Sequence, residues 1–237
     1  MRIIKTLIKK ELIFYLTSNL SFLSMTVFTL CSALSVLQTK EIFFLNQTAA
    51  LFAYMPYTFI LLLPALSIHI WPEERKDKTL SFLLSFPIHE YEILLSKFIA
   101  AWLYMIAMIV TTLPLIIILT QYQEIDMGVV YSGYVGTVLL ATMMLALVCC
   151  LSSLSKRAAV VYLTTFSTLL LLYHSAENVI TSLFPSDYHT LLQSLSIKTQ
   201  YQNLMNGSIS LDAISYFLSL TLFFLIVNLE IIKIKRD

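Results

Sequence analysis

Six long apolar stretches without charged side chains divide the sequence. A helix needs about 20 consecutive apolar residues to cross a bilayer core of about 30 Å, so each stretch is expected to span a membrane. The fifth is the shortest, and we expect it either to continue through His174 and Ser175 or to be less tilted than its neighbours. The six expected spans are residues 13–37, 49–70, 98–120, 127–151, 158–173 and 213–229.

This pattern predicts an all-α, polytopic membrane protein with six transmembrane helices. Residues 1–237 contain no internal repeat, low-complexity tract or soluble domain, so a single transmembrane domain is expected. The notable segments outside the spans are the N-terminal residues 1–11, a connection at 71–97 and a connection at 177–212.

Composition supports this interpretation and excludes other classes of protein. Hydrophobic residues make up 58% of the chain and charged residues 12%, with a mean hydropathy of +0.82. Soluble proteins carry about one quarter charged residues, so a soluble globular enzyme is excluded. The net charge of +1 provides no basic excess for nucleic acid. The three cysteines lie in apolar stretches and indicate no disulfide framework.

Basic residues are distributed unevenly between the two ends of the spans. Of the 15 Lys and Arg residues, all but Lys40 and Lys198 fall before the first span, after the last, or in the connections 71–97 and 152–157. The positive-inside rule therefore predicts that both termini are cytoplasmic, as an even number of spans requires. We expect a multi-pass membrane protein.

The expected spans contain no Asp, Glu, Lys or Arg, and His69, His174 and Glu230 lie only at their ends. Ion-coupled transporters usually carry ionisable groups at mid-membrane. The energy for any transport is therefore expected to come from outside the spans. A path lined by uncharged polar groups or backbone carbonyls is the alternative.

Catalytic and metal-binding motifs are weak in this sequence. Gly128 and Gly133 have the spacing of a phosphate-binding loop, but Tyr134 stands where that loop requires Lys. His174 and Glu177 share a helical face, yet a metal needs further ligands, so a polar helix end is favoured there. We expect no catalytic, cofactor-binding or metal-binding residues in this chain.

Small residues in the fourth span form faces on which another helix can pack closely. They are Gly133, Gly136, Ala141 and Ala146. Packing within the chain is favoured over a subunit interface.

The N-terminal segment 1–11 has the pattern of an amphipathic helix. Ile3, Ile4, Leu7 and Ile8 share one face, and basic residues occupy the other. Such a helix lies in the membrane interface with its lysines towards anionic head groups. The alternative is a simple basic flank of the first span.

The connection 71–97 combines a charge cluster with a short apolar segment. Leu80, Leu83 and Leu84 have helical spacing, and Pro87 ends the segment. An apolar surface of this kind exposed to the cytosol calls for a partner with a groove. The alternative is a segment that lies on the membrane interface.

These residues also resemble a known family. The run from Glu73 to Thr79, the Leu83-Leu84 pair, Pro87-Ile88 and Lys97 are similar to the connection between helices two and three of type-2 ABC transporter permeases. The gliding-motility-like bacterial branch is the most similar. The resemblance extends along nearly the whole chain, although Lys78 and Ser81 stand where the family usually has Gly and Glu.

The resemblance implies a permease subunit that carries no ATPase motif and presents a coupling helix to a separate ABC ATPase subunit, where ATP and Mg²⁺ bind. It also implies two permease copies or paralogues in one assembly, and short helices in the 177–212 connection that cap the translocation path. The residues that it assigns to ATPase coupling are Glu73, Glu74, Arg75, Thr79, Leu80, Leu83, Leu84 and Pro87.

The sequence thus predicts an ABC permease, most simply part of an exporter driven by ATP hydrolysis in its partner. A non-transporting assembly that transmits force to an envelope protein fits the same features. A stand-alone channel or intramembrane enzyme would require charged or metal-binding groups that the expected spans lack.

Overall fold

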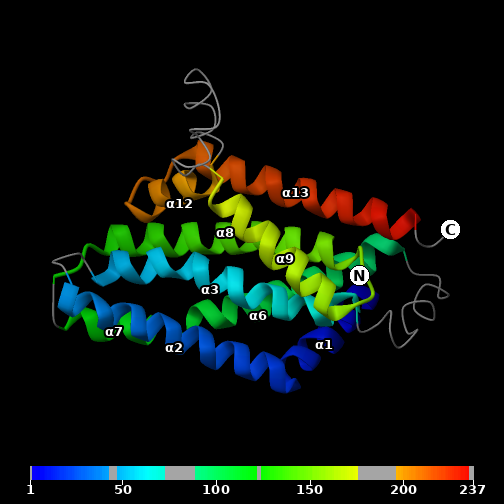
Figure 1. The fold of residues 1–237 in the computed structure, drawn as a ribbon, viewed down its shortest axis with the longest axis horizontal. Coiled ribbons are helices and arrows are strands. Elements are labelled where there is room, and N and C mark those ends of the chain that lie inside the picture. The colour runs from blue at the N-terminus through cyan, green and yellow to red at the C-terminus, as the bar shows by residue number, and fades with distance from the viewer. Residues whose placement is uncertain (1, 43–46, 73–88, 122–123, 176–195, 235–237) are drawn as a thin grey trace.

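The computed structural model describes residues 2–42, 47–72, 89–121, 124–175 and 196–234. All regular elements in these ranges are α-helices, which confirms the predicted fold class (Figure 1). They are α1 (Arg2–Thr17), α2 (Asn19–Ile42), α3 (Gln47–Ile70), α6 (Glu90–Val110), α7 (Leu113–Thr120), α8 (Met127–Ser152), α9 (Ala158–Tyr173), α12 (Ile197–Met205) and α13 (Leu211–Ile234).

Five described segments are long and apolar enough to cross a membrane, and α9 is a shorter apolar helix. The five are Asn19–Leu37, Thr48–Ile70, Glu90–Thr120, Met127–Ser152 and Leu211–Ile234. Helix α9 ends at Tyr173, and His174 and Ser175 form a turn, so the expected extension of the fifth span is wrong. Helix α1 and the last turns of α13 lie towards the same end of the bundle, and α12 lies towards the other (Figure 1). We refer to these as the α1 end and the α12 end.

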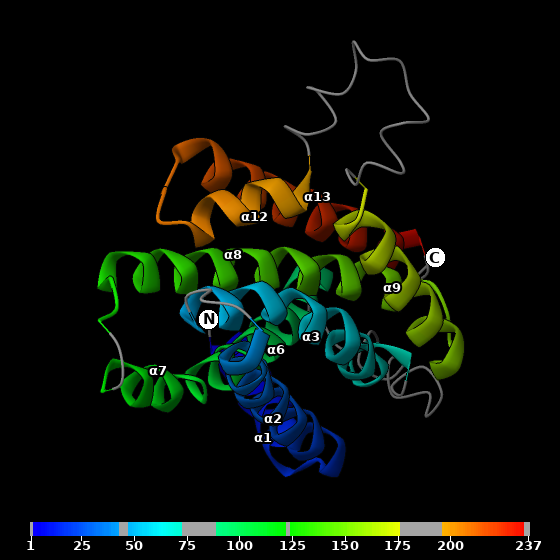
Figure 2. The same cartoon turned by 60° about the vertical axis from the view of Figure 1, so that its left-hand side comes forward.

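The first expected span, 13–37, is wrong at its start. The N-terminal helix continues past residue 11 to Thr17, and the chain changes direction near Ser18 before α2 (Figure 1). In Figure 2 the two helices lie one in front of the other. Within α1, Glu11 and Tyr15 are buried whereas Leu16 is exposed. Of residues 13–17 only Tyr15 is buried, and Ile13, Phe14 and Leu16 are exposed apolar side chains. An exposed apolar helix of this kind fits the membrane interface, and hydropathy alone does not separate it from a span.

The third span differs from the expectation at both its start and its middle. Helix α6 begins at Glu90, eight residues before the expected boundary, so the connection 71–97 is shorter than expected and Lys97 lies inside a helix. Helix α6 ends at Val110, and α7 follows with Pro114 in its first turn. Proline lacks an N–H and fits the start of a helix, which explains the division of this span.

Helix α8 is the centre of the bundle. It contacts α3, α6, α9, α12 and α13, and its residues 143–150 are all buried. A Cβ atom on Gly133 would lie 2.7 Å from the Phe52 ring, and one on Gly136 would lie 2.8 Å from the Leu204 Cβ. These two glycines therefore allow α3 and α12 to approach α8, which confirms their role in packing within the chain.

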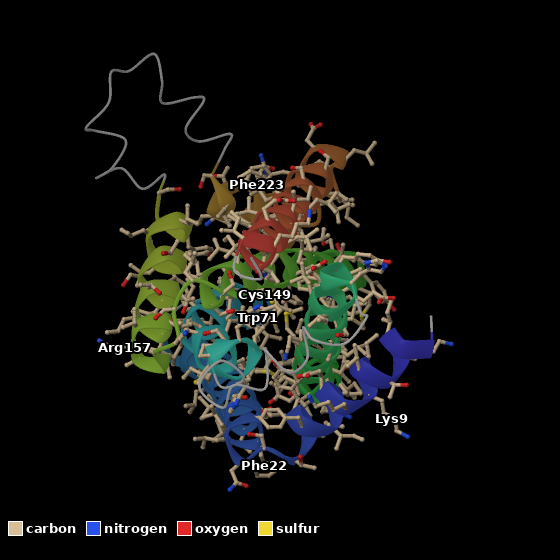
Figure 3. All side chains as sticks on the ribbon, turned by 90° about the vertical axis from the view of Figure 1, so that its right-hand side faces the viewer. Lys9, Phe22, Trp71, Cys149, Arg157 and Phe223 are labelled. Carbon is tan, nitrogen blue, oxygen red and sulfur yellow. The ribbon has the colours of Figure 1, made fainter. Side chains whose placement is uncertain are left out.

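The outer faces of α2 and α13 are apolar and exposed. Phe22 and Phe223 point away from the bundle, whereas Trp71 and Cys149 lie in its interior (Figure 3). Apolar residues on the outside and a packed interior are what a helix bundle in lipid requires.

Replacing Gly133 with Ala is expected to destabilise the bundle by about 1–3 kcal/mol, because the added methyl group would overlap the Phe52 ring. The temperature of unfolding in detergent measures this effect. Phe52→Leu removes the overlapping ring atoms, so the double variant is expected to be no less stable than Gly133→Ala alone. If the losses of stability from Gly133→Ala and Phe52→Leu simply added in the double variant, the proposed overlap between the two side chains would be contradicted.

Candidate functional site

The residues expected to contact an ATPase lie outside the described part of the chain. Glu73, Glu74, Arg75, Thr79, Leu80, Leu83, Leu84 and Pro87 all fall within 73–88. Their assignment remains a prediction. The described residues on either side of this segment are Trp71 and Pro72, which follow α3, and His89, which precedes α6.

A buried ion pair joins α1 to α6 close to this segment. The Nζ atom of Lys97 lies 3.3 Å from Oε1 of Glu11, and the two side chains are 4% and 11% exposed. The same carboxylate oxygen lies 3.6 Å from the exposed ammonium group of Lys10. Removing one partner from a buried pair leaves the other charge uncompensated, so this contact fixes α1 firmly against α6.

Trp71 connects the pair to α3. Its side chain is fully buried, and the Lys97 ammonium group lies 5.5 Å from the centroid of its ring, within the range of a cation–π contact. We call Glu11, Trp71 and Lys97 the charge cluster. It brings together α1, α6 and the end of α3 at the α1 end.

Hydroxyl groups join the helices elsewhere in the bundle. Four side-chain hydrogen bonds join two helices, or join a helix to the turn at 111–112. They are Ser24–Tyr104 at 2.9 Å, Thr29–Thr111 at 2.9 Å, Trp102–Thr142 at 2.8 Å and Thr112–Tyr134 at 3.0 Å. Uncharged groups of this kind bond across helices in lipid at modest cost. They agree with the expected scarcity of charge in the spans.

A second polar site lies at the α12 end. The Tyr201 hydroxyl of α12 donates to the Phe52 carbonyl oxygen of α3 at 2.7 Å and lies 3.1 Å from Oγ1 of Thr137 of α8. Burial raises the pKa of the Tyr201 phenol, an effect that the Thr137 hydrogen bond opposes, so the hydroxyl keeps its proton and can donate. Helix α12 lies in the 177–212 connection, where the family resemblance implied short helices.

The expected polar helix end at the close of the fifth span is only partly described. His174 lies against the rings of Tyr57 and Tyr173. Glu177 lies outside the described residues, so the pairing of the two stays untested. The described residues contain no group of three or more His, Cys, Asp or Glu side chains that could hold a metal ion.

A comparison with family models decides the class of this bundle. The model described as "ABC-2 family transporter protein" matches residues 6–232. The chain belongs to this family. It is a membrane permease subunit of an ABC transporter, and permeases of this kind are not themselves ATPases. A comparison with curated proteins gives no match.

The hydropathy pattern does not reveal the charge cluster. Hydropathy places the boundary of the third span at the last charge and so leaves Lys97 in the connection before it. Glu11 follows Ile4, Leu7 and Ile8 at helical spacing, so this carboxylate stands on the apolar face of the N-terminal helix. A carboxylate on an apolar helix face requires a buried partner, so the position of Glu11 in the sequence is the feature that could have indicated the ion pair.

Replacing Lys97 with Met is expected to destabilise the permease by about 3–5 kcal/mol, because the Glu11 carboxylate stays buried without its partner. The temperature of unfolding in detergent measures the loss. The double variant Glu11→Leu, Lys97→Leu is expected to recover most of it, since both charges are gone.

Lys233→Met is the matched control for this prediction. It breaks an exposed pair in which Lys233 Nζ lies 2.7 Å from Glu230 Oε1, and exposed pairs contribute about 0–1 kcal/mol. If Lys97→Met and Lys233→Met lowered the stability equally, the buried pair would contribute no more than an exposed one.

Proposed function

We propose that this permease is the membrane subunit of an ABC exporter driven by ATP hydrolysis in a separate ATPase subunit. ATP and Mg²⁺ bind on that partner, and a second permease copy or a paralogue completes the assembly. The protein resides in the bacterial inner membrane with both termini in the cytoplasm. The run from Glu73 to Pro87 supports membership of the gliding-motility-like branch.

The charge cluster is the observation that carries this proposal. Segment 73–88 is bounded by Trp71 on one side and by α6 on the other. Trp71 lies over the Lys97 ammonium group, and Lys97 pairs with Glu11, so both flanks of the segment connect to α1 through buried contacts. A force that an ATPase applies to the segment would thus move α1, α3 and α6 together and would not be absorbed by a loose connection.

The orientation is supported by charge and by the arrangement of the helices. Lys5, Lys9 and Lys10 are exposed on α1, and Lys156 and Arg157 are exposed in the turn between α8 and α9. Helix α1 and the last turns of α13 lie towards the same end of the bundle (Figure 1). The positive-inside rule assigns this end to the cytoplasm.

Replacing both Leu83 and Leu84 with Asp is expected to abolish co-purification of the ATPase while leaving membrane insertion intact. Burying a carboxylate in an apolar groove costs several kcal/mol, which lowers the affinity by about three orders of magnitude. The ATPase recovered with affinity-tagged permease measures this. The matched control is Ser81→Asp with Ser85→Asp, which adds the same charge at positions next to Leu80 and Leu84 in the sequence. Full recovery of the ATPase with the leucine variant would remove these leucines from the interface.

Cysteine labelling in intact cells tests the orientation. Gln202→Cys lies at an exposed position of α12, and Lys156→Cys lies in the exposed turn between α8 and α9. A membrane-impermeant maleimide is expected to label position 202 directly and position 156 only after the membrane is permeabilised. The parent chain provides the background from its native cysteines. The reverse pattern would overturn the proposed topology.

A further inference from the structure

A proline in α3 leaves a backbone carbonyl without its usual partner. In an α-helix the Phe52 carbonyl would accept from the N–H of residue 56, but Pro56 has no N–H. An unpaired carbonyl is costly inside a membrane protein, where water does not reach it. The Tyr201 hydroxyl donates to this oxygen at 2.7 Å and so replaces the missing helical hydrogen bond.

The donor is held in place by α8. Tyr201 is 1% exposed, and its oxygen lies 3.1 Å from the Thr137 hydroxyl. The single Thr137 proton has two acceptors within reach, the Tyr201 oxygen and the Gly133 carbonyl oxygen of its own helix at 2.8 Å. Tyr201 of α12 therefore lies between Thr137 of α8 and the Phe52 carbonyl of α3, and its own proton goes to that carbonyl.

Apolar contacts also join α8 to α12 and to Gly207, which follows α12. Leu204 packs against Gly136, and a Cβ on Gly207 would lie 3.4 Å from a Val129 methyl group. Ser132 is 1% exposed and stands three residues after Val129 and four before Gly136, so helical spacing puts it near the same face of α8. We therefore expect α12 to cover Ser132, so that the accessibility of this position reports whether α12 is closed over α8.

We propose that Tyr201 is a positioning residue of the transport cycle. Its hydrogen bond to the Phe52 carbonyl holds α12 closed over α3 and α8, and release of this bond opens the α12 end of the path. Apolar contacts are not directional, so they allow α12 to shift along α8 at little cost. A hydrogen bond depends strongly on distance and angle, so the bond from Tyr201 fixes one position of α12. This inference rests on the proposed transport function, because only a transporter requires this end to open.

The permease chain alone, in lipid nanodiscs, tests the hydrogen bond. Ser132→Cys exchanges one atom and places a thiol at this buried position, and its rate of reaction with a polar maleimide is expected to report opening. Adding Tyr201→Phe is expected to raise this rate about tenfold, which corresponds to about 1.4 kcal/mol. The parent chain without Ser132→Cys provides the background.

The partner of Tyr201 is identified by restoring the helical donor. In a Pro56→Ala background the N–H of residue 56 bonds to the Phe52 carbonyl, so Tyr201→Phe is expected to change the rate less than about twofold. Pro64→Ala is the matched control, because the carbonyl that Pro64 leaves unpaired is that of Ile60, about two turns along α3. There the tenfold effect is expected to persist. An equal effect in all backgrounds, or none in any, would overturn the proposal.

Dependence on nucleotide separates a gate from a purely structural contact. In the complex with the co-purified ATPase, labelling of Ser132→Cys is expected to rise about tenfold on trapping with Mg-ATP and vanadate. Unchanged labelling would overturn the role of α12 in gating while leaving the proposed function intact. The labelling cycle uses the permease alone, so its result is independent of whether an ATPase co-purifies.

Discussion

The absence of water in the bilayer core is the constraint on which this structure depends. Every backbone N–H and carbonyl must find a partner within the protein, and an α-helix pairs them within one segment. Where a proline removes a donor, the helix can end or another group can replace the donor. Pro114 coincides with the division between α6 and α7. Pro56 is accommodated inside α3, where a side chain from α12 supplies the missing donor.

The same constraint explains where charge occurs in the described residues. A charge in hydrocarbon is tolerated when it is paired, and the buried Lys97 is paired with Glu11. This pair lies at the end where α1 meets α6, not at mid-membrane. The hydroxyl contacts elsewhere in the bundle carry no charge. The charge cluster is accordingly a structural junction between α1, α6 and the end of α3, and its role in transmitting movement is part of the proposed function.

Hydropathy predicts much of the fold because lipid-facing helices must be apolar. It finds both ends of α9 and the start of α8 at Met127. It does not find the change of direction near Ser18 or the start of α6 at Glu90, since these depend on which surfaces α1 covers. The Tyr201 contact joins residues 149 positions apart, and no local pattern indicates it. The ATPase-coupling residues of segment 73–88 remain predictions from sequence resemblance.

Helices α3 and α8 pack against each other, yet they differ in their content of proline. Helix α8 contains no proline and is buried along much of its length, so its hydrogen-bond ladder resists bending. Helix α3 carries Pro56 and Pro64, each of which removes one bond of its ladder. Trp71 follows α3 at the charge cluster, and Phe52 lies near its other end, beside Tyr201. If the proposed transport function holds, we expect a displacement of Trp71 to bend α3 at its prolines while α8 stays straight, and this bending would change the position of the carbonyl that Tyr201 holds.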